Sequence, residues 1–310
     1  MFMFKKDKKE YFAVAIMGLL FLLIYGLVII LIEPFVIRGG VEQVWGEDIN
    51  NPINILQIIV IMLAITVVIL LIARYWKDKI IQFIILFAVG YTSFYAFFLP
   101  VLNIIFPNYP YIVLGLSILL AIILVIILYK YPEWYVIDLS GIIIGVGAII
   151  IFGISLGILL VILLLIGLAI YDAISVYKTK HMIDLADTVM DLKLPILLVV
   201  PKIRKYSLIK ETRRLKEQIE EGEERDAFFM GLGDIVMPGI LVAAAYSHIE
   251  NGLPIALSVI LGTLIGFLIL MTSVMKGKPQ AGLPLLCSGA IGGYLISSFI
   301  IYGKIVGLSI

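Results

Sequence analysis

The chain has 310 residues, of which 62% are hydrophobic and only 15% are charged, and its mean hydropathy is +1.15. Soluble globular domains carry about 45–50% apolar and about 25% charged residues, so this composition excludes that class and indicates an integral membrane protein. The net charge of +1 does not suggest a nucleic-acid partner, and a single cysteine, Cys287, excludes an intrachain disulfide. Cys287 lies in an apolar run and is predicted to be a small packed hydrophobic residue.

Apolar runs of about 20 residues, the length that crosses a bilayer, recur along the chain. The first, residues 11–32, is too long for a signal peptide and no small-residue cleavage site closes it, so it predicts a transmembrane helix. As one helix, the apolar region over 136–177 would be about 63 Å long, roughly twice the hydrocarbon core, so we divide it near residues 152–155. The predicted spans are residues 11–32, 53–73, 80–99, 111–130, 137–153, 154–176, 227–247, 253–274 and 283–303.

The positions of the basic residues test this count of nine spans. With an inner N-terminus and an outer C-terminus, all of the 23 Lys and Arg residues except Arg38 and Lys304 fall on the inner side. Eight spans would put the basic segment over 178–225 on the wrong side. Because basic residues are retained on the cytoplasmic side, the sequence predicts an all-α polytopic membrane protein with nine transmembrane helices and a cytoplasmic N-terminus.

One connection is long, an inner polar segment over residues 177–226. It separates a six-helix part over 1–176 from a three-helix part over 227–310. Its charged end predicts a solvated helix or a mobile linker, because that end has little apolar surface to bury. Its apolar stretch over 194–201 is too short to span. Two interpretations of this stretch stay open: a docked interfacial segment, or a β-prone edge that pairs with an extended peptide.

Glycines recur four residues apart in the fifth and sixth spans, as Gly141 and Gly145 and as Gly153 and Gly157. This spacing lets helix backbones approach closely, and we interpret it as packing rather than as a nucleotide-binding loop. Asp138, at the inner edge of the fifth span, is predicted to be an interfacial cap.

Two aspartates lie well inside predicted spans, Asp172 in the sixth and Asp234 in the seventh. A charged residue at the centre of a membrane helix costs about 2.5–3.5 kcal/mol, so it faces protein or water and indicates a functional site. The alternative is a buried structural carboxyl. Both lie about 8–10 Å from the inner surface, at ~1.5 Å per residue, on antiparallel helices joined on that side. We therefore expect the two carboxyls to meet at one depth.

Two adjacent carboxylates cannot both ionise easily, so such a pair shares a proton. One carboxylate can activate a water against a peptide carbonyl while the other protonates the leaving amine. Because the two titrate as a unit, which of them begins as the base stays open.

The sequence around Asp234 favours an opening in the helix. Gly231 and Gly233 remove side chains beside the aspartate, so another backbone can come close. Pro238 has no N–H for the carbonyl of Asp234 and loosens the helix at that point. Freed backbone at membrane depth is tolerated where it lines protein or a wet cavity, so these residues predict an aqueous site.

These residues form recognisable motifs. Tyr171-Asp172 and Gly231-Leu232-Gly233-Asp234 resemble the YD and GxGD motifs of presenilins and signal peptide peptidases, which are intramembrane aspartyl proteases with nine spans. The family's third motif, Pro-Ala-Leu-Pro, should begin the ninth span, where this chain has Ala281-Gly282-Leu283-Pro284. The replacement of its first proline and its alanine bears on substrate docking more than on the chemistry.

The resemblance implies that Asp172 and Asp234 are catalytic and that water is the nucleophile. Site-shaping roles are expected for Tyr171, Gly231, Leu232, Gly233, Ala281, Gly282, Leu283 and Pro284. It implies no metal or organic cofactor, and substrates that are transmembrane helices of other proteins in the lipid bilayer. A substrate strand beside the seventh span would suit residues 196–200. Assembly into a homo-oligomer stays open. The compact chain with an inner N-terminus is similar to a prokaryotic, archaeal homologue, which would place it in the cell membrane.

Other chemistries fit the sequence less well. No His-Glu-x-x-His motif occurs, and His181 and His248 fall on opposite sides of the predicted topology, which argues against a zinc protease. A proton- or cation-coupled transporter or channel could use the same aspartates, but six spans and three do not form an inverted repeat. A scaffold that holds transmembrane helices without cutting them is a further alternative.

Overall fold

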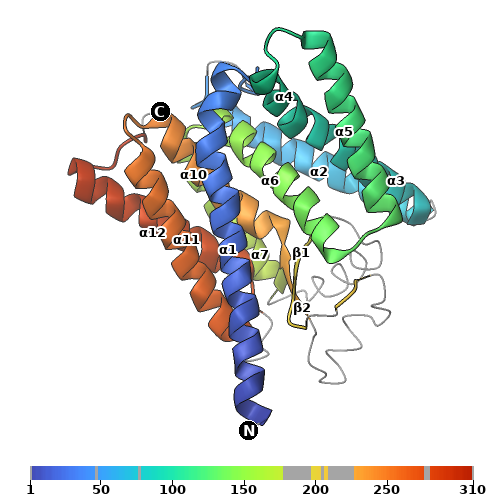
Figure 1. The fold of residues 1–310 in the computed structure, drawn as a ribbon. Helices are drawn as coiled ribbons and strands as arrows, with labels where there is room; N and C mark the ends of the chain where they lie inside the picture. Colours follow the sequence, from blue (N-terminus) through green and yellow to red (C-terminus); the bar gives the residue numbers. More distant parts are fainter. Residues whose placement is uncertain are drawn as a thin grey trace.

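The computed structural model describes residues 2–45, 48–75, 78–176, 197–203, 206–208, 227–275 and 280–308. These residues form a bundle of helices with one small sheet (Figure 1). The first six helical segments are α1 (Phe2–Ile37), α2 (Pro52–Tyr75), α3 (Asp78–Ser93) continuing through η1 (Phe94–Phe98) into α4 (Leu99–Ile105), α5 (Pro110–Lys130), α6 (Trp134–Ser155) and α7 (Ile158–Ile174). After strands β1 (Leu197–Pro201) and β2 (Ala227–Gly231) come α10 (Leu232–His248), α11 (Leu253–Val274) and α12 (Gly282–Tyr302).

The nine predicted spans each coincide with one helical segment among the described residues. The third span consists of α3, η1 and α4 in succession. The π-helical turn η1 precedes Pro100, which offers no N–H to the preceding turn, so the helix widens there. The division of the long apolar region is confirmed, because α6 ends at Ser155 and α7 begins at Ile158.

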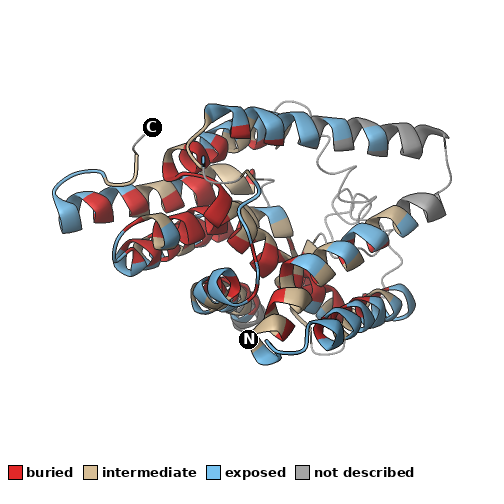
Figure 2. Ribbon diagram, turned by 90° about the horizontal axis from the view of Figure 1, so that it is seen from above, coloured by how far each residue is buried: buried red, intermediate tan, exposed pale blue. Residues whose placement is uncertain are grey.

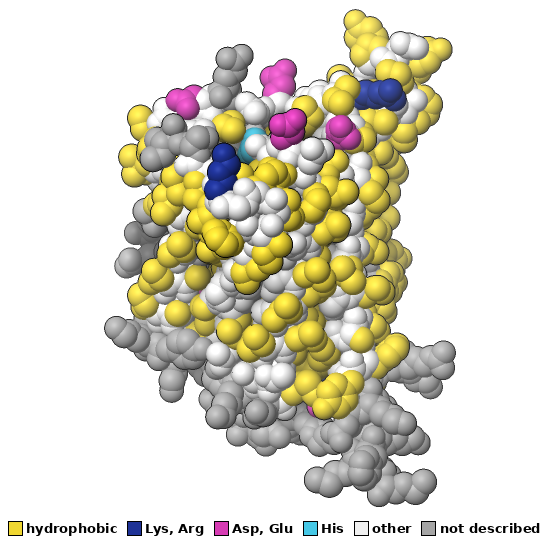
Figure 3. Space-filling view, turned by 90° about the vertical axis from the view of Figure 1, so that its left-hand side faces the viewer, with side chains coloured by type: hydrophobic (Ala, Val, Ile, Leu, Met, Phe, Trp, Pro, Cys, Tyr) yellow, Lys and Arg dark blue, Asp and Glu magenta, His cyan; other side chains and the backbone are white. Residues whose placement is uncertain are grey.

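The described helices fit a bilayer by length and composition. Six are long and apolar enough to cross one: Glu10–Ile37, Gln82–Ile105, Pro110–Lys130, Trp134–Ser155, Leu253–Val274 and Gly282–Tyr302. Shorter apolar helices cover Pro52–Ile61, Ile158–Ile174 and Leu232–His248. Hydrophobic side chains form a broad band over the face in Figure 3, and charged side chains gather at its upper rim. The two chain ends lie at opposite ends of the bundle (Figure 1), as an odd number of crossings requires.

The start of the seventh span differs from the prediction. Residues 227–231, predicted to be helical, form strand β2, which pairs antiparallel with β1. Backbone N–H and C=O groups at membrane depth need partners, and the apolar stretch over 197–201 supplies them. The described residues of the stretch 194–201 therefore form a strand, but its partner is β2 of the same chain and not an extended peptide. The predicted solvated helix or linker at the charged end of segment 177–226 lies outside the described residues.

The core surrounds α10, which contacts α1, α6, α7, α11 and α12. Buried residues concentrate in these helices, while α2, α3 and α5 present exposed faces around them (Figure 2). Glycines of α6 allow α10 to approach this helix closely. A Cβ built on Gly145 would contact Leu232 of α10 at 3.4 Å, and one built on Gly153 would overlap Ala243. The predicted role in close helix packing is therefore confirmed for Gly145 and Gly153.

Helices α11 and α12 pack still more closely. Gly262 and Gly266 on α11 face Gly289 and Leu285 on α12, and a Cβ on either glycine of α11 would overlap a backbone carbonyl of α12. Lipid tails are as apolar as leucine, so helices in a bilayer associate through van der Waals packing rather than through hydrophobic burial. This backbone contact fixes the position of the first turn of α12, where the candidate site lies.

Candidate active site

Asp172 lies in the last turns of α7 and is buried, with 3% of its surface exposed. Its Oδ2 atom accepts a hydrogen bond from the backbone N–H of Leu283, at 3.1 Å. The backbone N–H of Gly282 also interacts with this carboxyl. The first N–H groups of a helix have no partner inside the helix, and the positive end of the helix dipole favours an anion. Asp172 therefore caps α12 from a neighbouring helix.

Asp234 lies in the first turn of α10 and reaches the same place. A Cβ built on Gly282 would lie 2.8 Å from Asp234 Oδ2, and one built on Gly231 would lie 3.5 Å from that atom. The carboxyl is also close enough to Asp172 for the two charges to interact. The structure thus brings both carboxyls to the first turn of α12, one on the backbone of Leu283 and one against Gly282.

The glycines explain how these groups fit together. At position 282 any side chain would press on the carboxyl of Asp234, so glycine is the residue that leaves it room. Alanine occupies this place in the motif that the sequence resembles, and the replacement therefore alters the wall of the site itself. No atom lies within 4 Å of a Cβ built on Gly233, so that side of the backbone next to Asp234 is open among the described residues.

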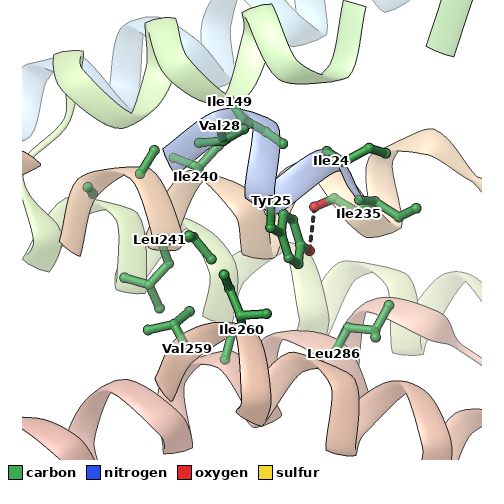
Figure 4. Close-up of a cluster of buried hydrophobic side chains, with 14 of the residues drawn as sticks. Ile24, Tyr25, Val28, Ile149, Ile235, Ile240, Leu241, Val259, Ile260 and Leu286 are labelled. Atoms are coloured by element: carbon green, nitrogen blue, oxygen red, sulfur yellow. Dashed lines mark hydrogen bonds between the residues drawn. The ribbon is translucent and has the colours of Figure 1, made fainter. Parts of the chain in front are cut away.

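Helix α10 continues through Pro238 without a break, and the turn after Asp234 has a partner that the sequence did not suggest. Tyr25 of α1 is fully buried, and its hydroxyl donates a hydrogen bond to the backbone carbonyl of Ile235, at 2.8 Å (Figure 4). The aromatic ring also lies against Gly239, where a Cβ would come 2.8 Å from Tyr25 Cε1. Because Pro238 lacks an N–H, this turn of α10 has one internal hydrogen bond fewer, and Tyr25 holds it from outside.

The two-stranded sheet lies next to the candidate site, because β2 ends at Gly231 and Asp234 is in the first turn of the helix that follows. Cα partners run from Leu197 with Gly231 to Pro201 with Ala227. The backbone N–H of Val199 donates to Asp138 Oδ1 on α6 at 2.8 Å, so it points away from β2. In an antiparallel pair the bonded positions alternate, and the bonds between β1 and β2 therefore run through Leu198 and Val200.

This pattern gives the two strands different outer edges. The outer edge of β1 is occupied by α6 at Val199, and Pro201, the next residue facing that way, has no N–H. In β2, the N–H and C=O groups of Phe229 and the N–H of Gly231 face away from β1, and no hydrogen bond to them is present among the described residues. The C=O of Gly231 is the N-cap acceptor of α10. The unpaired edge is therefore that of β2, which leads directly to Asp234.

Asp138 corrects a sequence prediction. The sequence predicts an interfacial cap at Asp138, but the residue lies inside α6, is 7% exposed and accepts a hydrogen bond from the backbone of β1. The reason is that residues 197–201 dock on α6 and present it with an N–H that needs an acceptor away from water. The sequence around Asp138 does not indicate this partner, because Val199 lies 61 residues further along the chain.

Comparison with known proteins identifies the family of the chain. The family model for "Signal-peptide peptidase, presenilin aspartyl protease" matches residues 17–303. The chain belongs to this family. Two solved structures described as a presenilin family intramembrane aspartate protease, in C222 and P2 space groups, are 31% and 33% identical to it. Each match includes 92% of this chain and 96% of the solved chain, and the TM-scores are 0.63 and 0.65. No curated protein matched.

The presenilin-family chain is accordingly a multi-pass intramembrane aspartyl protease. The rival interpretations as a transporter or as a non-cleaving scaffold lose their support. An aspartyl protease needs two carboxyls on one peptide bond, and among the described residues the pair at Asp172 and Asp234 meets on one helix end.

The other residues expected to shape the protease site lie in different environments. Leu232 packs on Gly141 and Gly145 of α6, and Ala281 is the buried residue before α12. Pro284 lies in the first turn of α12, where a proline is tolerated because its N–H would have no partner. Tyr171 is 71% exposed, so its side chain is not packed against the two aspartates. Cys287 is buried in the core cluster, as predicted.

Proposed function

We propose that Asp172 and Asp234 are the catalytic residues of this protease and act as one acid–base pair on a water molecule. The proposal is supported by the meeting of both carboxyls at the N-terminal turn of α12. Repulsion and burial keep one proton on the pair, so it contains a base and an acid at once. The hydrogen bond from Leu283 holds Asp172 in place and stabilises its negative charge.

The reaction follows from that protonation state. The ionised carboxyl takes a proton from water while the water oxygen attacks the peptide carbonyl carbon, and the protonated carboxyl donates its proton to the developing oxyanion. The tetrahedral intermediate collapses when one of its hydroxyl groups returns a proton to the ionised carboxyl, its C–N bond breaks and the amine takes a proton from the other carboxyl. The pair returns to one shared proton, and the products are a new carboxylate and a new amine terminus.

The substrate is a transmembrane helix of another protein, and part of it must unwind to expose a carbonyl to the pair. The unpaired edge of β2 suits such an extended segment, because Phe229 and Gly231 offer backbone groups in line with Asp234. β1 does not suit it, since β2 and α6 occupy its edges at Leu198, Val199 and Val200. We therefore assign the substrate strand to β2 instead of to residues 196–200.

The test is cleavage of a single-span peptide by the detergent-purified protein, followed by mass spectrometry. We expect fragments with defined ends from the unaltered protein, and a loss of at least ~100-fold in rate in both Asp172→Asn and Asp234→Asn, the scale of general acid–base catalysis. Asp48→Asn is the matched control, because Asp48 is an exposed residue between α1 and α2. Unchanged cleavage by either active-site variant would refute the assignment.

The orientation is proposed with the N-terminus in the cytoplasm and the C-terminus outside, which suits the distribution of Lys and Arg. In a prokaryotic cell this membrane would be the cell membrane. In a Cys287→Ala background, Pro132→Cys would lie inside and Glu250→Cys outside. We expect a membrane-impermeant maleimide added to intact cells to label the second and not the first. The reverse labelling would overturn the orientation and leave the chemistry untouched.

A further inference from the structure

Asp138 is a buried acid on α6 that the catalytic pair leaves without a role. Only 7% of it is exposed, and its Oδ1 atom accepts the N–H of Val199 at 2.8 Å. An ionisable residue in a membrane helix has a bonded partner or a function. Its partner is the backbone of a strand, and in the described part of the chain it is the only side chain bonded to the backbone of β1.

The surface of α6 around Asp138 is shaped to receive that strand. One turn further along α6, a Cβ built on Gly141 would lie 3.1 Å from Leu198 Cδ2 and 3.7 Å from Leu232 Cδ1. The missing side chain lets β1 and the start of α10 lie directly on the helix. Asp138 then provides the polar contact that a flat apolar surface lacks, and so fixes where along α6 the strand sits.

The chain beyond β1 is held by different groups. Glu133, before α6, accepts the hydroxyl of Ser207 at 2.6 Å and the N–H of Leu208 at 3.1 Å. Lys202 pairs with Glu10 of α1 at 3.2 Å. These contacts hold Lys202, Ser207 and Leu208, whereas Asp138 holds the strand itself. The effects of Asp138, in α6, and of Glu133, just before α6, can therefore be separated by experiment.

We propose that Asp138 is a positioning residue for proteolysis: by holding β1 on α6, it keeps the outer edge of β2 in place for the substrate strand. The proposal rests on the proposed docking of substrate to β2. The coupling runs from Asp138 to Val199, across the bonds of Leu198 and Val200 to β2, and so to the free N–H and C=O of Phe229 and the free N–H of Gly231. Asp138 does not touch the substrate.

The spacing of residues along a strand determines how the loss of Asp138 should change the position of cleavage. Neighbouring residues along a strand are about 3.3 Å apart, and reacting atoms must come within about 3–3.5 Å. If the edge of β2 moves, the substrate strand bound to it moves too, and a different peptide carbonyl of the substrate lies next to Asp172 and Asp234. Loss of the hydrogen bond between Asp138 and Val199 should raise KM and spread cleavage over neighbouring peptide bonds of the substrate. It should change kcat less, because Asp172 and Asp234 keep their own contacts with α12.

The experiment compares Asp138→Ala, Asp138→Asn and Glu133→Ala with the unaltered protein on one single-span peptide. Fragments are located by mass spectrometry, and kcat and KM are measured separately. We expect Asp138→Ala to raise KM about tenfold or more, the scale of a lost hydrogen bond to a charged group, and to add cleavage sites. Asn keeps the Oδ1 acceptor, so Asp138→Asn should retain the original sites. Glu133→Ala should also retain them.

A second variant covers the case in which Asp138→Ala does not fold. Val199→Pro removes the N–H from the other side without touching the bonds to β2, because that N–H points to α6. We expect the same spread of cleavage sites from it. Original sites and KM in both Asp138→Ala and Val199→Pro would overturn the positioning role while leaving the catalytic pair intact. A fall in kcat alone, with KM and sites unchanged, would also overturn it. Absence of cleavage by the unaltered protein would instead refute the proposed function.

Discussion

The helices that carry the active site and the helices around them are built differently. In α10, α11 and α12, glycines let backbones touch, as where Gly262 faces Gly289. In α5, Gly115 has no atom within 4 Å of a built Cβ, and large residues such as Ile122 are half exposed. Figure 2 shows the same contrast between a buried centre and an exposed periphery.

This difference has a physical reason in the bilayer. Burying a leucine between helices gains little where lipid already surrounds it, so only close and specific packing fixes one helix against another. Peripheral helices can therefore face lipid with large side chains. The first turn of α12 must hold two acids in fixed positions, and it depends on backbone contact. Substitutions in the two regions should thus have very different effects.

The largest effect is expected where α11 and α12 touch. Gly289→Val would put a branched side chain into the backbone of α11, next to the carbonyl of Gly262. Overpacking costs about 1–3 kcal/mol or more, so we expect lower thermal stability and at least ~10-fold less cleavage. Gly115→Val is the matched control in α5 and should unfold at the temperature of the unaltered protein. Equal effects of the two would remove the contrast.

A smaller effect is expected at the wall of the active site. Gly282→Ala restores the alanine of the family motif but places a methyl about 2.8 Å from Asp234 Oδ2. We expect kcat to fall about tenfold, because displacement of about 1 Å at a catalytic group can have such an effect. KM and thermal stability should stay near their original values. Faster cleavage by this variant would mean that Asp234 has room that the structure does not show.

The support that Tyr25 gives to the first turns of α10 can be tested at one atom. Tyr25→Phe removes only the hydroxyl that donates to Ile235. The expected loss is about 1 kcal/mol of stability, the net contribution of a typical hydrogen bond, with a few-fold loss of kcat. Phe21 is a nearby buried residue of α1, and Phe21→Leu controls for packing changes in that helix. A loss of stability with kcat unchanged would show that Tyr25 supports the fold and not the site.

The smallest effect is expected at the periphery. Ile122→Ala on α5 shortens a side chain that is 50% exposed. Surface changes of this kind shift stability by about 0.5 kcal/mol or less, and cleavage should not change. A loss comparable to that of Gly289→Val would show that α5 contributes to the catalytic core.

The sequence predicted the parts of the fold that a bilayer imposes. Apolar length and the placement of Lys and Arg predicted all nine helical segments, and the carboxyls at 172 and 234 were predicted from the cost of charge in lipid. Contacts that depend on tertiary structure were not predictable. Residues 227–231 looked like helix because their partner strand lies about 30 residues earlier, at 197–201. Tyr25 gave no signal either, since a buried tyrosine reveals its acceptor only once α1 is placed.

The central claim is that Asp172 and Asp234 act together on one peptide carbonyl at the first turn of α12. Its most direct test is the binding of a peptide analogue in which a hydroxyl-bearing tetrahedral carbon replaces the scissile carbonyl, measured by fluorescence anisotropy. Such analogues bind far more tightly than substrates when the transition state is recognised. We predict that Asp172→Asn and Asp234→Asn each weaken binding at least about tenfold and that Asp48→Asn does not. Full affinity in either active-site variant would contradict the account.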